Sequence, residues 1–345
     1  MSTLQLALVI VGGLLLAAVV AHGAWAARKM TPRQPQRAAD ELPQPATEAI
    51  EPSMDVDPFV APPAPPHPPS EKKPGLDALI DVIAPVVLEV ELHGEAVIAA
   101  LPSTRRVGSK PFAVEGLNCD NRQWEAPLPG QRYEALQAGV QLANRSGALN
   151  EIEFSEFVAK THAFSDAVGG TADFPDMLEE VARARELDQF ASGHDAQLGF
   201  TLRARSAAWS PGYVQQQAAR LGFVAGSVPG RMVLPAAATG LPPVLSLIFD
   251  TQAALAEDPA QAAVRQVSLA LDVAQVDRSE QPFVRLREVA QAMAQAMDGV
   301  ITDDNGQPLA RDAMDAIGGE LEGLYDTLEI RDLAAGSALA RRLFS

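Results

Sequence analysis

The chain has 345 residues, of which 47% are hydrophobic and 21% are charged, so most of it is expected to fold once non-globular segments are set aside. Its formal net charge of −17 argues against nucleic-acid binding, because contact with a phosphate backbone requires a basic face. Cys119 is the only cysteine, which excludes an intrachain disulfide and a site built on several thiolates.

A membrane anchor is predicted at residues 1–26. Residues 4–26 contain no Asp, Glu, Lys or Arg, and about 20 apolar residues suffice to cross a bilayer core. A cleaved signal peptide is the alternative, since residues 24–26 (AWA) resemble a cleavage site, but such peptides begin with positive charge. Here the positive charges follow the apolar run, at Arg28, Lys29, Arg33 and Arg37. They favour a single-pass anchor with a periplasmic N-terminus and cytoplasmic C-terminal domains.

A proline-rich, disordered linker is predicted at residues 27–78. This stretch holds 13 of the 27 prolines of the chain, and proline favours the extended polyproline II conformation. The linker could serve as a ligand for an SH3-like domain. The simpler interpretation is a spacer that holds a folded domain away from the membrane.

Two similar series of elements follow the linker. In the first, strands are expected at 86–92, 111–116 and 133–144, and helices at 94–101, 152–168 and 175–191. In the second, strands are expected at 198–203, 231–235, 244–250, 264–273 and 300–304, and helices at 211–221, 281–297 and 313–332. The repeated order predicts an α+β fold made of two tandem related units, 79–193 and 194–345, each an antiparallel sheet with helices on one face. Residues 341–344 are expected to be a frayed tail, with a membrane or subunit contact as the alternative.

Four segments of the second series carry a family resemblance: LGFVAG at 221–226, PVLSL at 243–247, VSLALDV at 267–273 and MDGVITDDNG at 297–306. In this order, and behind an anchor and a proline-rich linker, they resemble the ZipA family with its C-terminal FtsZ-binding domain. The resemblance extends from about Asp195 to Asp332. Residues 79–193 have no counterpart in the shorter members of the family, which leaves a duplicated domain and an unrelated insertion both open.

The resemblance implies a cell-division protein of the bacterial inner membrane, located at midcell, which tethers FtsZ filaments without catalysis. The C-terminal peptide of FtsZ would bind a hydrophobic groove on the sheet face opposite the helices. Alternation predicts that Val267, Leu269 and Leu271 face the helices. The groove residues expected from the resemblance are Phe200, Met232, Leu247, Phe249, Thr251, Ser268 and Ala270. For two strands the alternatives Leu198 for Phe200 and Val233 for Met232 stay open, and a shift of one residue would place Leu247 and Phe249 in the core.

Other functions find little support in the sequence. The P-loop, the dinucleotide-binding glycine pattern and the Gly-x-Ser-x-Gly elbow are absent, and the five histidines lack ligand spacing, so neither an enzyme nor a cofactor or metal is expected. The alternative function is a membrane-anchored envelope or regulatory scaffold that binds a different protein or peptide. Self-association through Gly12 and Gly13 of the anchor also stays open, although these glycines lack the GxxxG spacing.

Overall fold

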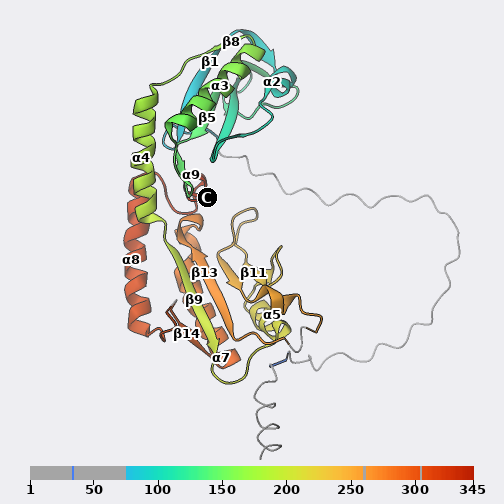
Figure 1. The fold of residues 1–345 in the computed structure, drawn as a ribbon, viewed down its shortest axis with the longest axis vertical. Helices are drawn as coiled ribbons and strands as arrows, with labels where there is room; N and C mark the ends of the chain where they lie inside the picture. The colour runs from blue at the N-terminus through green and yellow to red at the C-terminus, as the bar shows by residue number, and fades with distance from the viewer. Residues whose placement is uncertain (1–32, 35–74, 259–261, 304) are drawn as a thin grey trace, which may run out of the picture. The chain divides into compact units, whose positions relative to one another are not determined.

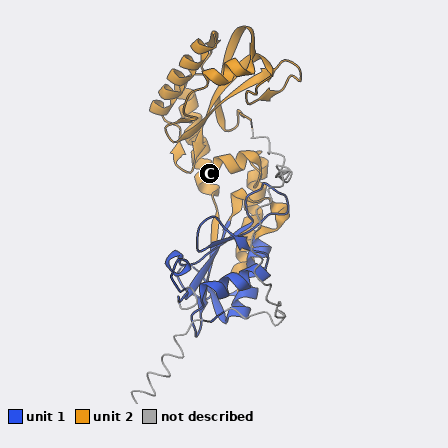
Figure 2. Cartoon of the chain, turned by 90° about the vertical axis from the view of Figure 1, so that its right-hand side faces the viewer, with its two compact units in different colours: residues 1–71, 199–271, 283–310 blue, residues 72–198, 272–282, 311–345 orange. Residues whose placement is uncertain are grey.

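A computed structural model describes residues 33–34, 75–258, 262–303 and 305–345 (Figure 1). The predicted anchor and most of the predicted linker lie outside these residues. Among the helices in the described ranges, none has both the length and the apolarity of a bilayer span. The described residues form two compact units (Figure 2). Unit 1 contains Gly199–Leu271 and Phe283–Ala310, and unit 2 contains 75–198, Asp272–Pro282 and Arg311–Ser345.

Unit 2 contains the N-terminal sheet, whose strands follow the order β2-β3-β5-β1-β8, with β4 pairing on β3. Its strands are β1 (Asp81–His93), β2 (Arg106–Val107), β3 (Lys110–Asn118), β4 (Trp124–Glu125), β5 (Arg132–Gln141) and β8 (Gly170–Ala172). The central strand β1 pairs antiparallel with β5 and with β8. Val82, Ala84 and Val86 of β1 are at most 1% exposed, so one face of the sheet forms the core of the unit.

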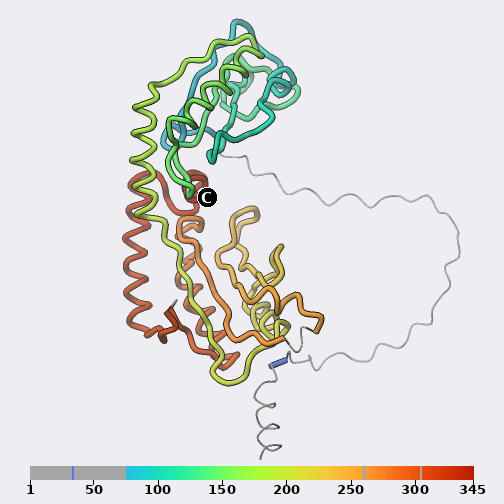
Figure 3. The backbone as a smooth tube through the Cα atoms, in the orientation of Figure 1, coloured from blue at the N-terminus to red at the C-terminus, as the bar shows by residue number. Residues whose placement is uncertain are grey.

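Helix α3 (Glu151–Ala167) covers that core face. Phe157 of α3 is fully buried, and its ring lies 6.2 Å from the ring of Phe112 on β3. The other elements of unit 2 are α2 (Gly94–Ala100), the hairpin β6 (Ala143–Asn144) and β7 (Gly147–Ala148), α4 (Met177–His194), η1 (Val273–Gln275), η2 (Arg278–Glu280), α8 (Arg311–Ile330) and α9 (Ala338–Leu343). Helix α4 runs without interruption in the backbone trace of Figure 3, and its Phe190 ring packs under the guanidinium of Arg331 at 4.5 Å.

A reciprocal cap starts α3. The side chain of Asn150 accepts hydrogen bonds from the backbone N–H of Ile152 and of Glu153, both at 3.0 Å, and the Glu153 carboxylate accepts from the Asn150 N–H. Three N–H groups that the helix itself leaves without acceptors are thereby satisfied.

Asn150→Ala should therefore destabilise unit 2 by about 1 kcal/mol, because it leaves the N–H groups of Ile152 and Glu153 without their acceptor. Thermal unfolding followed by circular dichroism measures this effect. Asn150→Ser is the matched control, since serine is also a good cap and should retain most of the stability. Equal losses in the two variants would contradict a capping role.

Unit 1 contains the C-terminal sheet, in the order β10-β11-β12-β13-β9-β14. Its strands are β9 (Gln197–Ala204), β10 (Val224–Ala225), β11 (Arg231–Leu234), β12 (Leu245–Ile248), β13 (Gln266–Asp272) and β14 (Gly299–Thr302), and its helices are α5 (Pro211–Arg220), α6 (Thr251–Ala254) and α7 (Pro282–Met297). Trp209 is fully buried beside α7, and its indole N–H donates to the carbonyl of Met297 at 2.8 Å. Arg33 adds a parallel bridge to Trp209 from the segment predicted as linker.

The predicted α+β class with antiparallel sheets is confirmed, and each predicted helix and strand is present with shifted ends. Five short strands (β2, β4, β7, β8 and β10) were not expected, because two or three residues are too few for a periodic pattern. The frayed C-terminal tail was a wrong prediction, since α9 forms there and Leu343 and Phe344 are each 1% exposed. The two sheets share a strand order around the first strand of each series. In the N-terminal sheet β1 lies between β5 and β8, and in the C-terminal sheet β9 lies between the corresponding strands β13 and β14.

Candidate functional site

The C-terminal sheet has a covered face that packs on helices. Leu269 of β13 pairs directly with Leu247 of β12, which in turn pairs with Met232 of β11. Directly paired residues of neighbouring strands point to the same face of a sheet. Leu247 and Leu269 are fully buried, and the ring of Phe200 lies 6.2 Å from the ring of Phe283 on α7. The covered face is therefore the core of unit 1.

Four of the seven predicted groove residues belong to this core, so their predicted orientation was wrong. Phe200 is 3% exposed, Met232 5%, Leu247 0% and Phe249 4%. The physical reason is strand register, because Leu247 pairs with Leu269 and not with Ser268. Phe249 follows the end of β12, where its N–H donates to the carbonyl of Gly230 at 2.9 Å.

The opposite, open face carries Ser268 and Ala270, as alternation predicted. Ser268 pairs with Ile248, and Ala270 pairs with Ser246. Ile248 is 42% exposed, and it was not among the predicted groove residues. The same face continues from Ser246 to its partner Val233 on β11 and from there to Val224 on β10, which is 51% exposed. The signal was available in the segment Leu245–Ile248, where two leucines alternate with Ser246 and Ile248. Larger side chains were assigned to the groove, whereas folding placed them in the core.

The predicted residues Phe249, Thr251 and Ser268 lie near one another beyond the end of β12. They line part of a hollow of about 550 Å³, together with Ile248, Asp250, Ala263, Val264, Arg265 and Gln266. Thr251 is exposed at the first turn of α6. At the other side of β12, the guanidinium of Arg231 donates to the Ser246 hydroxyl at 3.2 Å. The open face thus combines the apolar side chains of Ile248, Val233 and Val224 with several small ones and with Arg231, and it can take a short segment that carries an apolar anchor.

Comparison with known families finds a similarity to one family in the C-terminal part of the chain. Residues 253–319 match the family described as ZipA, C-terminal FtsZ-binding domain. The matched segment includes β13, α7, β14 and the first part of α8. It confirms the resemblance predicted from the sequence, and it supports an FtsZ-binding role in cell division. A binding domain of this kind acts through contact with its partner. No curated protein matches the chain significantly.

Proposed function

We propose that this protein tethers FtsZ to the inner membrane, with the C-terminal peptide of FtsZ bound on the open face of the C-terminal sheet. The observation that carries the proposal is the position of the family match, because its strand β13 contributes Ser268 and Ala270 to that face. The seven-residue groove first expected is replaced by a set centred on Ile248, Ser246, Ser268 and Ala270.

The physical basis is burial of an apolar anchor. Ile248 is the exposed apolar side chain on the two strands β12 and β13, and its neighbours on these strands are small enough for a peptide backbone to approach closely. A short peptide that docks through a few apolar side chains gains most of its affinity from such burial. Arg231 of β11, which pairs directly with Ile248, favours a peptide with an acidic residue near its apolar anchors.

The remaining parts of the proposal concern the rest of the chain. Residues 1–26 would anchor the protein in the inner membrane, with the N-terminus in the periplasm. Residues 27–78 would act as a spacer before two folded domains at 79–193 and 194–345. A tether of this kind would place the protein at midcell, where a fluorescent fusion should form a band that disappears when FtsZ is depleted.

Ile248→Glu should weaken binding of a fluorescent peptide with the sequence of the host FtsZ C-terminus by about tenfold or more. The new charge would have to be buried against the apolar anchor of the peptide. Fluorescence anisotropy with the full chain measures the dissociation constant.

Val284→Glu is the matched control, because Val284 is 47% exposed on α7 of the same unit and should leave affinity unchanged. Equal affinities of the wild type and Ile248→Glu would remove the open face of the C-terminal sheet from the proposal. Absence of any binding to the wild type would favour a scaffold that holds a different partner.

A further inference from the structure

The N-terminal sheet of unit 2 also has an open face, and a continuous row of mostly apolar residues crosses it. Each residue of the row pairs directly with the next one. The row is Thr171 (β8), Val87 (β1), Ala135 (β5), Leu117 (β3) and Trp124 (β4). It lies on the face opposite α3, because the alternate residues Val86 and Leu136 are each 1% exposed in the core.

The row presents large apolar side chains to solvent. Val87 is 65% exposed and Trp124 is 43% exposed. The open face of the C-terminal sheet also presents apolar side chains, with Ile248 at 42% and Val224 at 51% exposed. Large apolar side chains that are left together in water are typical of a surface that a partner covers.

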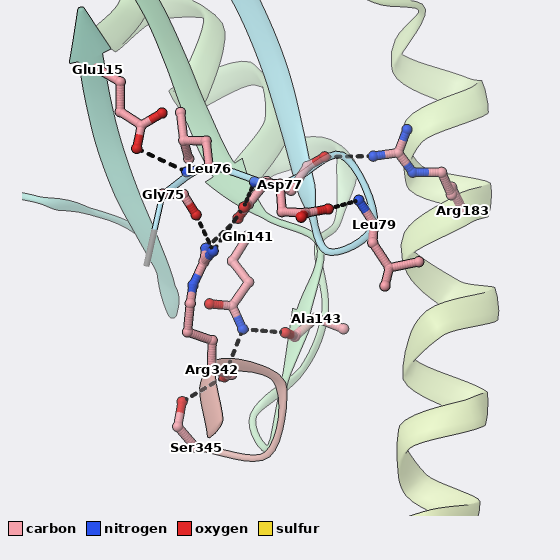
Figure 4. A network of polar contacts seen from close by, with 11 residues as sticks. Gly75, Leu76, Asp77, Leu79, Glu115, Gln141, Ala143, Arg183, Arg342 and Ser345 are labelled. Carbon is pink, nitrogen blue, oxygen red and sulfur yellow. Dashed lines mark hydrogen bonds and ion pairs between the residues drawn. The ribbon is translucent and has the colours of Figure 1, made fainter. Parts of the chain in front are cut away.

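One end of this face is already covered by the chain itself (Figure 4). The N–H of Leu76 donates to Glu115 at 3.0 Å, and a Cβ added to Gly139 would lie 2.5 Å from the Leu76 side chain. The second oxygen of Glu115 accepts from the Gln137 amide at 2.9 Å. An incoming segment of chain thus lies over the residues next to the row, with its polar groups satisfied, while the row itself stays exposed.

We propose that this row is a second docking face, which binds another copy of the FtsZ C-terminal peptide; the identity of the peptide rests on the proposed function. The N-terminal sheet has the same strand order around its central strand as the sheet that carries the family match. An apolar face on the same arrangement of strands can bind the same kind of ligand, a short peptide with apolar anchors.

The size and charge of the row favour a peptide over other partners. Five strands at a spacing of about 4.8 Å give a row about 19 Å long, enough for a short peptide. A row one side chain wide is too small for a stable dimer, which buries roughly 800 Å² on each partner. The arginines beside it are paired, Arg122 with Glu134 and Arg132 with Glu91, so the described residues offer no basic patch for anionic lipid on this face.

Isothermal titration calorimetry of the full chain with the unlabelled peptide tests the proposal. The wild type should bind two peptides per chain. Val87→Glu should remove one of them and keep the one that depends on Ile248, whereas the double variant should bind none. Ile152→Glu is the matched control, because Ile152 is 82% exposed on α3, on the other side of the sheet. Thermal unfolding establishes that each variant is folded, and Trp124→Ala provides a second variant at the far end of the row.

The outcomes separate this inference from the proposed function. A single site that Ile248→Glu removes and Val87→Glu leaves intact would overturn the second docking face only. A single site that Val87→Glu removes and Ile248→Glu leaves intact would support the face on the N-terminal sheet and overturn the site on the other sheet. A dimer that is lost in Val87→Glu, seen by light scattering, would show that a second copy of the chain occupies the row and would overturn the peptide as its occupant.

Discussion

Phe249→Glu should unfold unit 1, although the same substitution one residue earlier should leave it folded. Phe249 is 4% exposed, so the variant loses a packed aromatic ring and places a carboxylate among apolar side chains. Loss of a buried Phe side chain costs about 3–5 kcal/mol, and an unpaired buried charge adds several more. This sum is comparable with the total stability of a domain. Thermal unfolding should show a midpoint lowered by more than about 8 °C, or no cooperative transition.

Ile248→Glu is the matched control for this effect. Its side chain is 42% exposed on the open face, so the introduced charge stays in water. The unfolding midpoint should therefore fall much less than in Phe249→Glu. Comparing the two variants tests which face of β12 is covered. If Phe249→Glu melts like the wild type and Ile248→Glu does not, the face assignment of the whole sheet is inverted.

Arg342→Ala should destabilise unit 2 by about 3 kcal/mol, because it leaves a buried carboxylate without its countercharge. The side chain of Asp81 is 0% exposed, and Arg342 donates to its Oδ2 at 2.9 Å and to the carbonyl of Gly75 at 3.1 Å (Figure 4). The N–H of Asp77 provides a further donor to Asp81 at 2.8 Å. Helix α9 thereby contacts the segment from Gly75 to Asp81.

The defect in Arg342→Ala should depend on pH. Burial raises the pKa of Asp81 above its ordinary value of 3.8, and the guanidinium of Arg342 partly opposes this. Without Arg342 the pKa rises further, so the folded state binds a proton more tightly than the unfolded state. Stability lost at neutral pH should therefore return as the pH falls through the folded-state pKa of Asp81 toward 3.8. Thermal unfolding at neutral and mildly acidic pH measures this recovery.

Arg185→Ala is the control for the ion pair itself. Arg185 pairs with Glu151 on the surface of the same unit, where both side chains are exposed, and such pairs contribute about 0–1 kcal/mol. A loss in Arg342→Ala no larger than that in Arg185→Ala, or one that does not change with pH, would show that the buried pair contributes little.

The elements with long periodic patterns, and the family resemblance, could be predicted from local sequence. Helices α3, α4, α7 and α8 each repeat their apolar residues over several turns, and β13 alternates strictly at Val267, Leu269 and Leu271. These patterns are local, so they can be read without knowing what the element packs against. The placement of Ser268 and Ala270 opposite Leu269 followed from the same alternation.

Which face of a strand is covered, and which short segments fold against the rest of the unit, depends on tertiary contacts. Alternation groups Leu245 with Leu247 and Ser246 with Ile248, but the pairing of Leu247 with Leu269 determines that the first group is the core. The C-terminal residues form α9 because distant parts of unit 2 bury Phe344 and bind Arg342. Register and docking depend on partners that are far away in the chain, and a local pattern carries no information about them.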